Sequence, residues 1–302
     1  MTVPAQPAKP ARGTAILEAL AVMLIWGSSF VLVKTALNHA GPLTLAGLRY
    51  FAAFLILLPF MLRRNRQRFS RAQWLRLALI GLCAYTVGNG CLFWGMKYLP
   101  ATTTSFLMGL IPLLVLVMGI FWLREYPTLI QVAGLAVCLL GYGAFFTPGL
   151  GSGEKLGIAI TSGGLLAFAV FGILGREVAR DQSIGTLALT TFPLGIGGAA
   201  SLLIAFAVEG VPRITLTGAG IVLWLALVNT SLAYLLYNHS LQTLTALEMN
   251  LTLNLSPFAT AAIAALVLSE TFRPVQYLGM VIAVIGVAVA QWPRKNTSIR
   301  QL

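Results

Sequence analysis

Ten apolar stretches, separated by short polar breaks, fill almost the whole 302-residue chain. A helix needs roughly 20 apolar residues to cross the hydrocarbon core of a bilayer. A soluble core could bury one or two such stretches, but not ten. Because lipid offers backbone groups no hydrogen-bond partners, an open chain crosses it only as helices. The pattern predicts an all-α polytopic membrane protein with spans at 15–38, 43–62, 74–96, 100–122, 128–147, 155–176, 184–208, 217–240, 245–268 and 273–292.

Basic residues outnumber acidic ones, 20 Lys and Arg against 8 Asp and Glu, so the net charge is +12. A nucleic-acid-binding domain would gather such charge on one soluble face. Here six arginines fall within 63–76, in the break between the second and third predicted spans. With both termini in the cytoplasm, most basic residues lie on the cytoplasmic side, as the positive-inside rule requires. We therefore expect cytoplasmic termini, a lipid bilayer as partner and no nucleic acid.

The segment WLREYPTLIQVAG at 122–134 is repeated in outline as VLSETFRPVQYLG at 267–279. A shift of 145 residues aligns the two and extends beyond them. It pairs Leu99 with Leu244, Ala101 with Ala246, Pro112 with Pro257, Glu125 with Glu270, Gln131 with Gln276, Gly134 with Gly279 and Gly141 with Gly286. The chain therefore divides into two five-span repeats, 1–148 and 149–302. Because five is odd, the second repeat enters the membrane from the opposite side, and such inverted repeats are typical of secondary transporters.

Four segments carry a resemblance to a known family: WGSSFVLVKTAL (26–37), LAGLRYFAAFLILLP (45–59), MKYLPATTTSFLMGLIPLL (96–114) and LSPFATAAIAALVLSET (255–271). Over residues 15–292 the chain resembles the EamA-type drug/metabolite transporters. The resemblance implies ten helices in two inverted halves. It also implies export of small metabolites, often amino acids, across a bacterial inner (cell) membrane by alternating access. Within the family, the amino-acid exporter branch, aromatic amino acids included, is the preferred analogue.

Polar side chains mark two helix faces on spans that the resemblance implies line the pathway: the first, third, fourth, sixth, eighth and ninth. Asn250 and Asn254 are spaced i, i+4 in the ninth span, and therefore share a face. Tyr234 and Asn238 have the same spacing in the eighth span. The shift of 145 pairs these four, in that order, with Ser105, Gly109, Asn89 and Phe93. We interpret these faces as a pathway lining; the alternative is that the asparagines join helices by hydrogen bonds worth ~0.6–2 kcal/mol.

Aromatic and charged residues complete the predicted site. Trp26 lies deep in the first span, and its ring, like that of Tyr85, could stack on a substrate side chain. Arg49 lies inside the second span, where a charged residue is costly and is a functional candidate by default. Its guanidinium fork matches a substrate carboxylate, although carbonyls at a helix end would explain it equally well. The predicted substrate-binding residues are Trp26, Arg49, Tyr85, Asn89, Phe93, Ser105, Tyr234, Asn238, Asn250 and Asn254.

Other ionisable residues have two interpretations each. Lys34, near the end of the first span, could simply reach the membrane interface. Glu18 and Glu248 could carry protons or mark the membrane boundary. The small multidrug-resistance relatives have a first-helix carboxylate where this chain has Leu24. That difference argues against strong proton coupling and against bulky cationic drugs as substrates.

Prolines and glycines recur at matched positions of the two repeats. Pro112 and Pro257 each remove a helical hydrogen bond inside a span. We interpret them as hinges for alternating access, with static kinks as the alternative. Glycines spaced i, i+7 in the fifth and tenth spans predict close helix packing. They are Gly134, Gly141, Gly279 and Gly286.

The sequence gives little support to an enzyme. His39 and His239 fall on opposite sides of the membrane under this topology, and WGSSF lacks the strand-turn-helix context of a nucleophile elbow. Neither a metal-ligand cluster nor a phosphate-binding loop is apparent. We predict no catalytic residue, no cofactor and no metal, and a monomer that moves a small molecule. Within transport, a multidrug or nucleotide-sugar-type carrier is the alternative; outside it, a channel or a structural membrane protein.

Overall fold

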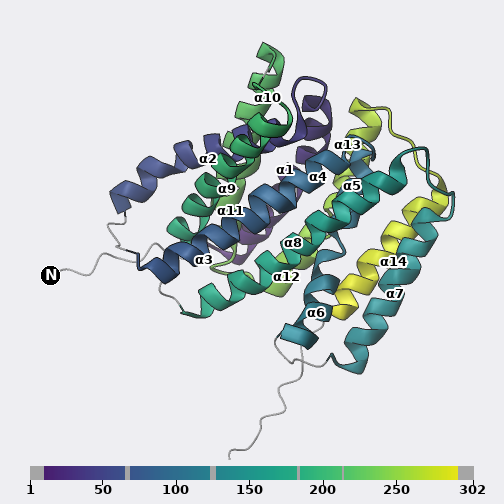
Figure 1. Cartoon of the computed structure of the whole chain (residues 1–302). Coiled ribbons are helices and arrows are strands. Elements are labelled where there is room, and N and C mark those ends of the chain that lie inside the picture. The colour runs from purple at the N-terminus through teal and green to yellow at the C-terminus, as the bar shows by residue number, and fades with distance from the viewer. Residues whose placement is uncertain (1–9, 65–68, 123–126, 182–183, 213, 292–302) are drawn as a thin grey trace, which may run out of the picture. The chain divides into compact units, whose positions relative to one another are not determined.

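The computed structural model describes residues 10–64, 69–122, 127–181, 184–212 and 214–291, and within these ranges it contains helices and no β-strand (Figure 1). Nine helical stretches in this part of the chain are long and apolar enough to cross a membrane, and a tenth apolar helix, Pro274–Ala290, is shorter. The predicted all-α fold of ten apolar helices is therefore confirmed. Arg66, Arg68 and Glu125, which the sequence arguments used, lie outside the described residues.

Several predicted spans are built from more than one helical piece. Two π-helical segments occur: the first π segment, Leu82–Gly88, joins α3 to α4, and the second π segment, Leu227–Leu232, joins α10 to α11. The helices are α1 (Arg12–Ala36), α2 (Pro42–Arg64), α3 (Arg71–Gly81), α4 (Asn89–Gly95), α5 (Ala101–Met108), α6 (Ile111–Trp122), α7 (Leu129–Phe146), α8 (Glu154–Asp181), α9 (Thr186–Val208), α10 (Leu216–Ala226), α11 (Ala233–Ser240), α12 (Ala246–Leu253), α13 (Ser256–Val267) and α14 (Pro274–Ala290).

The fourth and ninth predicted spans are both interrupted shortly before their proline. The break between α5 and α6 precedes Pro112, and the break between α12 and α13 precedes Pro257. Proline donates no backbone N–H, and its ring clashes with the carbonyl four residues earlier. This explains why each helix stops within one turn of the ring. The breaks occupy equivalent positions of the two repeats, and their use as hinges remains a prediction.

The two π segments also occupy equivalent positions, since their first residues, Leu82 and Leu227, are 145 residues apart. A π-helix bonds each carbonyl to the amide five residues later and occurs frequently at functional sites. In the second segment, Thr230 Oγ1 and Ser231 Oγ donate to carbonyls five residues earlier, both at 2.9 Å. Because the wide turn changes the angle between successive side chains, the i, i+4 rule does not hold across it.

Contacts divide the chain into two compact units, which we describe separately. The smaller unit comprises residues 112–149 and 272–302, and in its described part α7 packs along α14. Glycines allow the two backbones to touch. A Cβ added at Gly134 would lie 2.3 Å from Ala290 N, and one at Gly286 would lie 2.3 Å from Cys138 N. The close packing predicted for the glycines of these two spans is confirmed.

The larger unit comprises residues 1–111 and 150–271, so it draws helices from both sequence repeats. In this unit α2 packs along α9, and α4 packs along α8. Tyr50, Tyr85 and Phe93 are buried in its core. The division of the sequence into repeats at residue 148 remains a prediction, and it is a different division from that into compact units.

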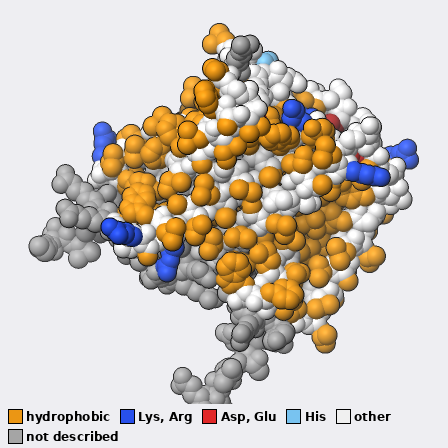
Figure 2. Space-filling model, in the orientation of Figure 1, with side chains coloured by type: hydrophobic (Ala, Val, Ile, Leu, Met, Phe, Trp, Pro, Cys, Tyr) orange, Lys and Arg blue, Asp and Glu red, His pale blue; other side chains and the backbone are white. Residues whose placement is uncertain are grey.

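Apolar side chains are also abundant on the surface. Figure 2 shows hydrophobic side chains spread over one face, with few Lys and Arg among them. In the larger unit, Leu203, Leu216 and Leu266 are 74%, 91% and 87% exposed. Such side chains are unfavourable in water but are compatible with lipid tails. The exposed apolar surface is therefore what helices facing a bilayer require.

Candidate substrate-binding site

Arg49, on α2, is only 6% exposed, and its guanidinium donates hydrogen bonds to two neighbouring elements. Its Nη1 donates to Ser29 Oγ on α1 at 2.8 Å. Its Nε donates to Thr230 Oγ1 at 3.0 Å and its Nη2 to Asn229 O at 3.3 Å, both in the second π segment. All three acceptors are neutral, and no carboxylate among the described residues pairs with the guanidinium. The hydrogen bonds offset part of the cost of burying the charge.

The guanidinium of Arg49 has five N–H donors, more than the three acceptors that hold it. Two aromatic rings lie near its central carbon: Tyr50 at 5.1 Å and Phe93 at 5.9 Å from the ring centroids. These are cation–π distances, at which the electron-rich ring faces attract the guanidinium. The fork is therefore oriented by the protein and keeps donors for one further acceptor, for which a carboxylate has the matching geometry.

Aromatic rings continue from Arg49 into a connected network. Tyr50 and Tyr85 have ring centroids 4.8 Å apart, and the Tyr85 hydroxyl donates to the Tyr234 hydroxyl at 3.1 Å. Trp26 lies 5.7 Å from Tyr234 and 5.6 Å from Tyr237, centroid to centroid. We call this set the central cluster. Its members are Trp26, Arg49, Tyr50, Tyr85, Phe93, Tyr234 and Tyr237, from α1, α2, the first π segment, α4 and α11.

Exposure varies across the central cluster. Arg49 and the rings of Tyr50, Tyr85 and Phe93 are buried, whereas Trp26 and Tyr234 are half-buried. The structure brings together five of the predicted site residues: Trp26, Arg49, Tyr85, Phe93 and Tyr234. Because buried and half-buried rings adjoin a buried cation, the cluster presents groups that complement a carboxylate and an apolar or aromatic group.

Two predicted residues take part in helix packing. Thr260 Oγ1 on α13 lies 3.0 Å from Ser105 Oγ and 3.0 Å from Gly27 O, so Ser105 belongs to a contact that joins α1, α5 and α13. Asn89 Nδ2 donates to Ala84 O at 2.8 Å, within the wide turn of the first π segment. Ser105 therefore joins separate helices, whereas the Asn89 bond stays within one continuous helical stretch.

No side-chain hydrogen bond or ring contact among the described residues joins the remaining predicted residues to the central cluster. Asn238 is half-buried and Asn250 is exposed. Asn254 lies at the C-terminal end of α12, and its Nδ2 is buried without a hydrogen-bond partner in the described part of the chain. A place for these three in the pathway stays a prediction. Tyr50 and Tyr237 were not among the predicted site residues, although each lies within three residues of a predicted one.

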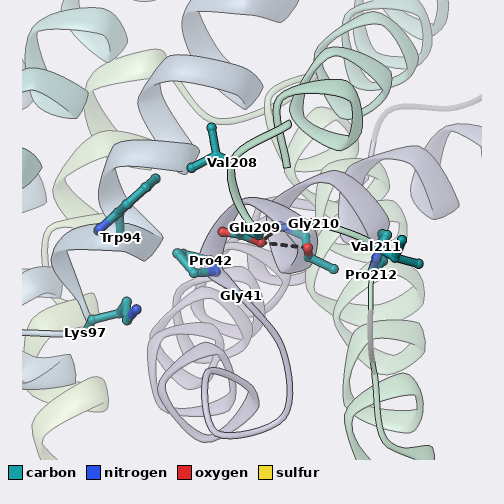
Figure 3. Close-up of a pocket in the computed structure, with 10 residues that line it drawn as sticks. Gly41, Pro42, Trp94, Lys97, Val208, Glu209, Gly210, Val211 and Pro212 are labelled. Carbon is teal, nitrogen blue, oxygen red and sulfur yellow. Dashed lines mark hydrogen bonds between the residues drawn. The ribbon is translucent and has the colours of Figure 1, made fainter. Parts of the chain in front are cut away.

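A separate pocket of about 650 Å³ lies at the start of α2 (Figure 3). Glu209, just after α9, accepts hydrogen bonds from Leu43 N at 2.8 Å and Thr44 N at 3.0 Å. The carboxylate therefore caps the α2 N-terminus, where unpaired N–H groups favour a negative charge. Figure 3 shows Trp94 and Lys97 across the pocket from Glu209. We interpret this pocket as part of the helix cap.

A second pocket, of about 440 Å³, contains Lys34 and Glu270. Lys34 Nζ donates to Leu99 O at 2.7 Å and also to the Met96 carbonyl. Glu270 accepts from Ala101 N at 2.6 Å. Opposite charges thus bind the two ends of the α4–α5 turn, the cation at the carbonyls and the carboxylate at the N–H groups. Lys34 therefore binds protein carbonyls, in place of the simple reach toward the interface considered from the sequence.

The other two singled-out carboxylates also have protein partners. Glu18 on α1 lies 2.8 Å from His239 Nδ1 and accepts from Ser240 Oγ at 3.2 Å. Glu248 forms a capping box with Thr245 and pairs with Arg12. The described residues contain no group of three His, Cys, Asp or Glu side chains that could hold a metal ion.

The family match decides the class of protein. The EamA-like transporter family model matches twice, at residues 13–147 and at residues 155–291. The chain belongs to the EamA-like transporter family. It is accordingly a multi-pass integral membrane protein and a transporter, with the two repeated halves that the sequence predicted.

Three curated proteins are examples of what this EamA-like chain is similar to. It is 28% identical to the uncharacterized transporter YyaM of Bacillus subtilis (strain 168), over 92% of this chain and 95% of the relative. It is 28% identical to an S-adenosylmethionine/S-adenosylhomocysteine transporter of Chlamydia trachomatis serovar L2, over 65% of this chain and 62% of that protein. It is 25% identical to a probable amino-acid metabolite efflux pump of Salmonella typhimurium (strain LT2), over 90% and 92%.

A solved crystal structure has the same fold as this EamA-like chain. The two superpose with a TM-score of 0.66, at 18% sequence identity, over 93% of this chain and 98% of the other. At that identity the likeness concerns the fold alone.

Proposed function

We propose that this EamA-like transporter exports amino acids and similar small metabolites, neutral and aromatic ones included, and that the central cluster binds them. The observation that carries the proposal is the buried guanidinium of Arg49, which has no carboxylate partner among the described residues and lies beside aromatic rings. An amino acid supplies the two groups that this arrangement lacks: a carboxylate for the fork and a side chain for the rings.

The names of two relatives support the same substrate class. One is a probable amino-acid metabolite efflux pump, and another transports S-adenosylmethionine and S-adenosylhomocysteine. Both of the latter compounds carry an α-amino acid group, so a shared head group with variable tails is consistent with both names. A nucleoside-linked amino acid is accordingly the second candidate substrate. We prefer it to the nucleotide-sugar alternative, for whose two phosphates the central cluster offers no second cationic group among its members, and to cationic drugs, which Arg49 would repel.

The remaining parts of the proposal concern setting and motion. We place the chain in a bacterial inner membrane, with both termini in the cytoplasm, as a monomer that works by alternating access. Pro112 and Pro257 are its proposed hinges, because both interrupt a span at equivalent positions. Ser105, Asn89, Asn238, Asn250 and Asn254 are proposed as further residues of the pathway, outside the central cluster.

Counterflow tests the proposal without requiring a known energy source. Purified protein is reconstituted into liposomes that are loaded with one unlabelled amino acid, and entry of the same labelled amino acid is followed. We expect liposomes that contain the protein to accumulate labelled neutral and aromatic amino acids transiently. Liposomes without protein should accumulate none. If no amino acid in the panel, nor S-adenosylmethionine, accumulates, the central cluster does not serve this substrate class.

The rings of the central cluster should favour large side chains. Trp26→Leu is expected to lower the apparent affinity for phenylalanine by about twofold to tenfold, because a ring contact worth about 0.5–1.5 kcal/mol is lost. Alanine, which cannot reach the ring, should be affected much less. Trp74→Leu is the matched control, since Trp74 packs on Phe69 and Phe192 in another cluster. Equal effects of the two substitutions on phenylalanine would contradict a substrate contact by Trp26.

A further inference from the structure

Asn229, in the second π segment, is a buried residue whose polar groups are only partly satisfied. It is 1% exposed. Its backbone carbonyl accepts the hydrogen bond from Arg49 Nη2, and its Nδ2 donates to Ile25 O and to Ser28 Oγ on α1. Its Oδ1 is buried and has no hydrogen-bond donor among the described residues. A buried amide oxygen therefore stands unpaired within the same residue that helps to hold the guanidinium.

The orientation of this amide is set by its neighbours. The Ile25 carbonyl can only accept a hydrogen bond, and it already faces Asn229 Nδ2. Ser28 Oγ donates its own proton to Ile25 O at 2.8 Å, so it too acts as an acceptor toward Asn229. Exchanging the amide oxygen and nitrogen would bring Oδ1 against these oxygens. The unpaired atom is therefore the oxygen, an acceptor, and it needs a donor.

A buried polar atom without a partner is costly, and native structures keep few of them. The π segment that carries Asn229 is itself an irregularity of a kind found frequently at functional sites. Arg49 beside it has unused donors, whereas Asn229 Oδ1 is an unused acceptor. The two complement a molecule that presents a carboxylate and a charged donor close together, and in an α-amino acid these groups are attached to one carbon.

We infer that Asn229 Oδ1 accepts a hydrogen bond from the substrate's α-ammonium group while Arg49 binds its carboxylate, so that the site selects zwitterionic α-amino acids. The inference rests on the proposed function of the central cluster and narrows it to one substrate class. Such a site should bind carboxylic acids that lack the amine, and amines that lack the carboxylate, more weakly than it binds α-amino acids. A hydrogen bond to a charged donor is about twice as strong as one between neutral groups, which makes the ammonium a strong source of selectivity.

The two repeats differ at the position of Asn229, so only the second repeat offers a place for a polar head group. The residue 145 positions before Asn229 is Ala84, and the one before Thr230 is Tyr85. The second π segment therefore offers an amide and a hydroxyl where the first offers a methyl group and a ring. A zwitterion can bind at the second segment with its side chain toward the first. Because its repeat partner Ala84 is apolar, Asn229 is not one of the positions that are polar in both repeats.

The test compares substrates that differ only in the amine. Counterflow is measured with wild-type protein for L-phenylalanine and 3-phenylpropionate, and for L-leucine and 4-methylpentanoate. We expect each amino acid to have an apparent affinity at least tenfold higher than that of its deaminated partner. In Asn229→Ala this ratio should fall toward one, through a roughly tenfold to hundredfold loss for the amino acid and little change for the acid.

Two further measurements separate binding from folding. The wild-type ratio needs no variant, so a wild-type ratio near one would overturn the inference even if Asn229→Ala fails to fold. Thr191→Ala is the matched control, because the Thr191 hydroxyl is buried without a partner in the described part of the chain and lies on α9. A ratio that stays unchanged in folded Asn229→Ala would also overturn the inference. Absence of amino-acid exchange in the wild type would instead overturn the proposed function.

Discussion

Gly286→Leu should abolish the packing of α7 against α14 and leave little folded protein. The added Cβ would lie 2.3 Å from Cys138 N and 2.6 Å from Cys138 Cα, and these are backbone atoms that no rotamer change can move aside. The two helices would have to separate along their length. Overpacking of a dense core costs about 1–3 kcal/mol, occasionally more, and a clash with backbone belongs at the upper end. The midpoint of thermal unfolding in detergent, followed by size-exclusion chromatography, measures the loss.

Gly143→Leu is the matched control for this prediction. Gly143 is on the same helix, α7, but a Cβ added there meets no atom within 4 Å. The substitution should leave the unfolding midpoint close to that of the wild type, because leucine also has a higher helix propensity than glycine. Equal midpoints for the two variants would show that α7 and α14 do not pack through their glycines.

Arg49→Lys should leave the protein folded and weaken amino-acid exchange by roughly tenfold to hundredfold. Lysine keeps the positive charge but replaces a planar fork with a point charge, so two parallel hydrogen bonds to a carboxylate are no longer available. Selectivity should also move toward decarboxylated amines. Counterflow with L-phenylalanine and with phenethylamine measures both effects, and the size-exclusion profile reports folding.

Arg63→Lys is the control for that substitution, since Arg63 is an exposed arginine at the far end of the same helix, α2. It should change neither affinity nor selectivity. If Arg49→Lys fails to assemble while residual transport keeps its substrate profile, Arg49 is a structural residue that joins α2 to α1 and the second π segment.

The arrangement of the spans could be predicted from the sequence because each span must satisfy two simple requirements. Its length must match the bilayer, and its backbone must bond internally. Proline chemistry likewise located the breaks before Pro112 and Pro257. The compact units could not be predicted this way. The smaller unit pairs α7 with α14, which are far apart in sequence, and only their glycine spacing indicated a close contact.

The candidate site could be predicted in part. Trp26 and Tyr85 were chosen as rings that could stack on a substrate, Arg49 as a charge that is costly inside a membrane, and Tyr234 by its i, i+4 spacing. The structure brings these four together. Asn89 was chosen as the repeat partner of Tyr234, and its side chain instead donates to the Ala84 carbonyl, five residues earlier in the first π segment. The repeat shift shows which positions are equivalent, but the wide turn before Asn89 supplies a protein acceptor that the sequence did not reveal.

Substrate protection of a single cysteine shows directly whether an amino acid binds at the central cluster. Ser28 accepts from Asn229 Nδ2, is half-buried, and differs from cysteine by one atom. Ser28→Cys is made in protein whose native cysteines, Cys83, Cys91 and Cys138, are replaced by alanine, and a small membrane-permeant thiol reagent is added. Ser152→Cys, at an exposed position, serves as the control. We expect L-phenylalanine to slow labelling at residue 28 at least several-fold and 3-phenylpropionate to slow it far less. Neither compound should change labelling at residue 152. Labelling at 28 that is indifferent to every amino acid tried would contradict a substrate site at the central cluster.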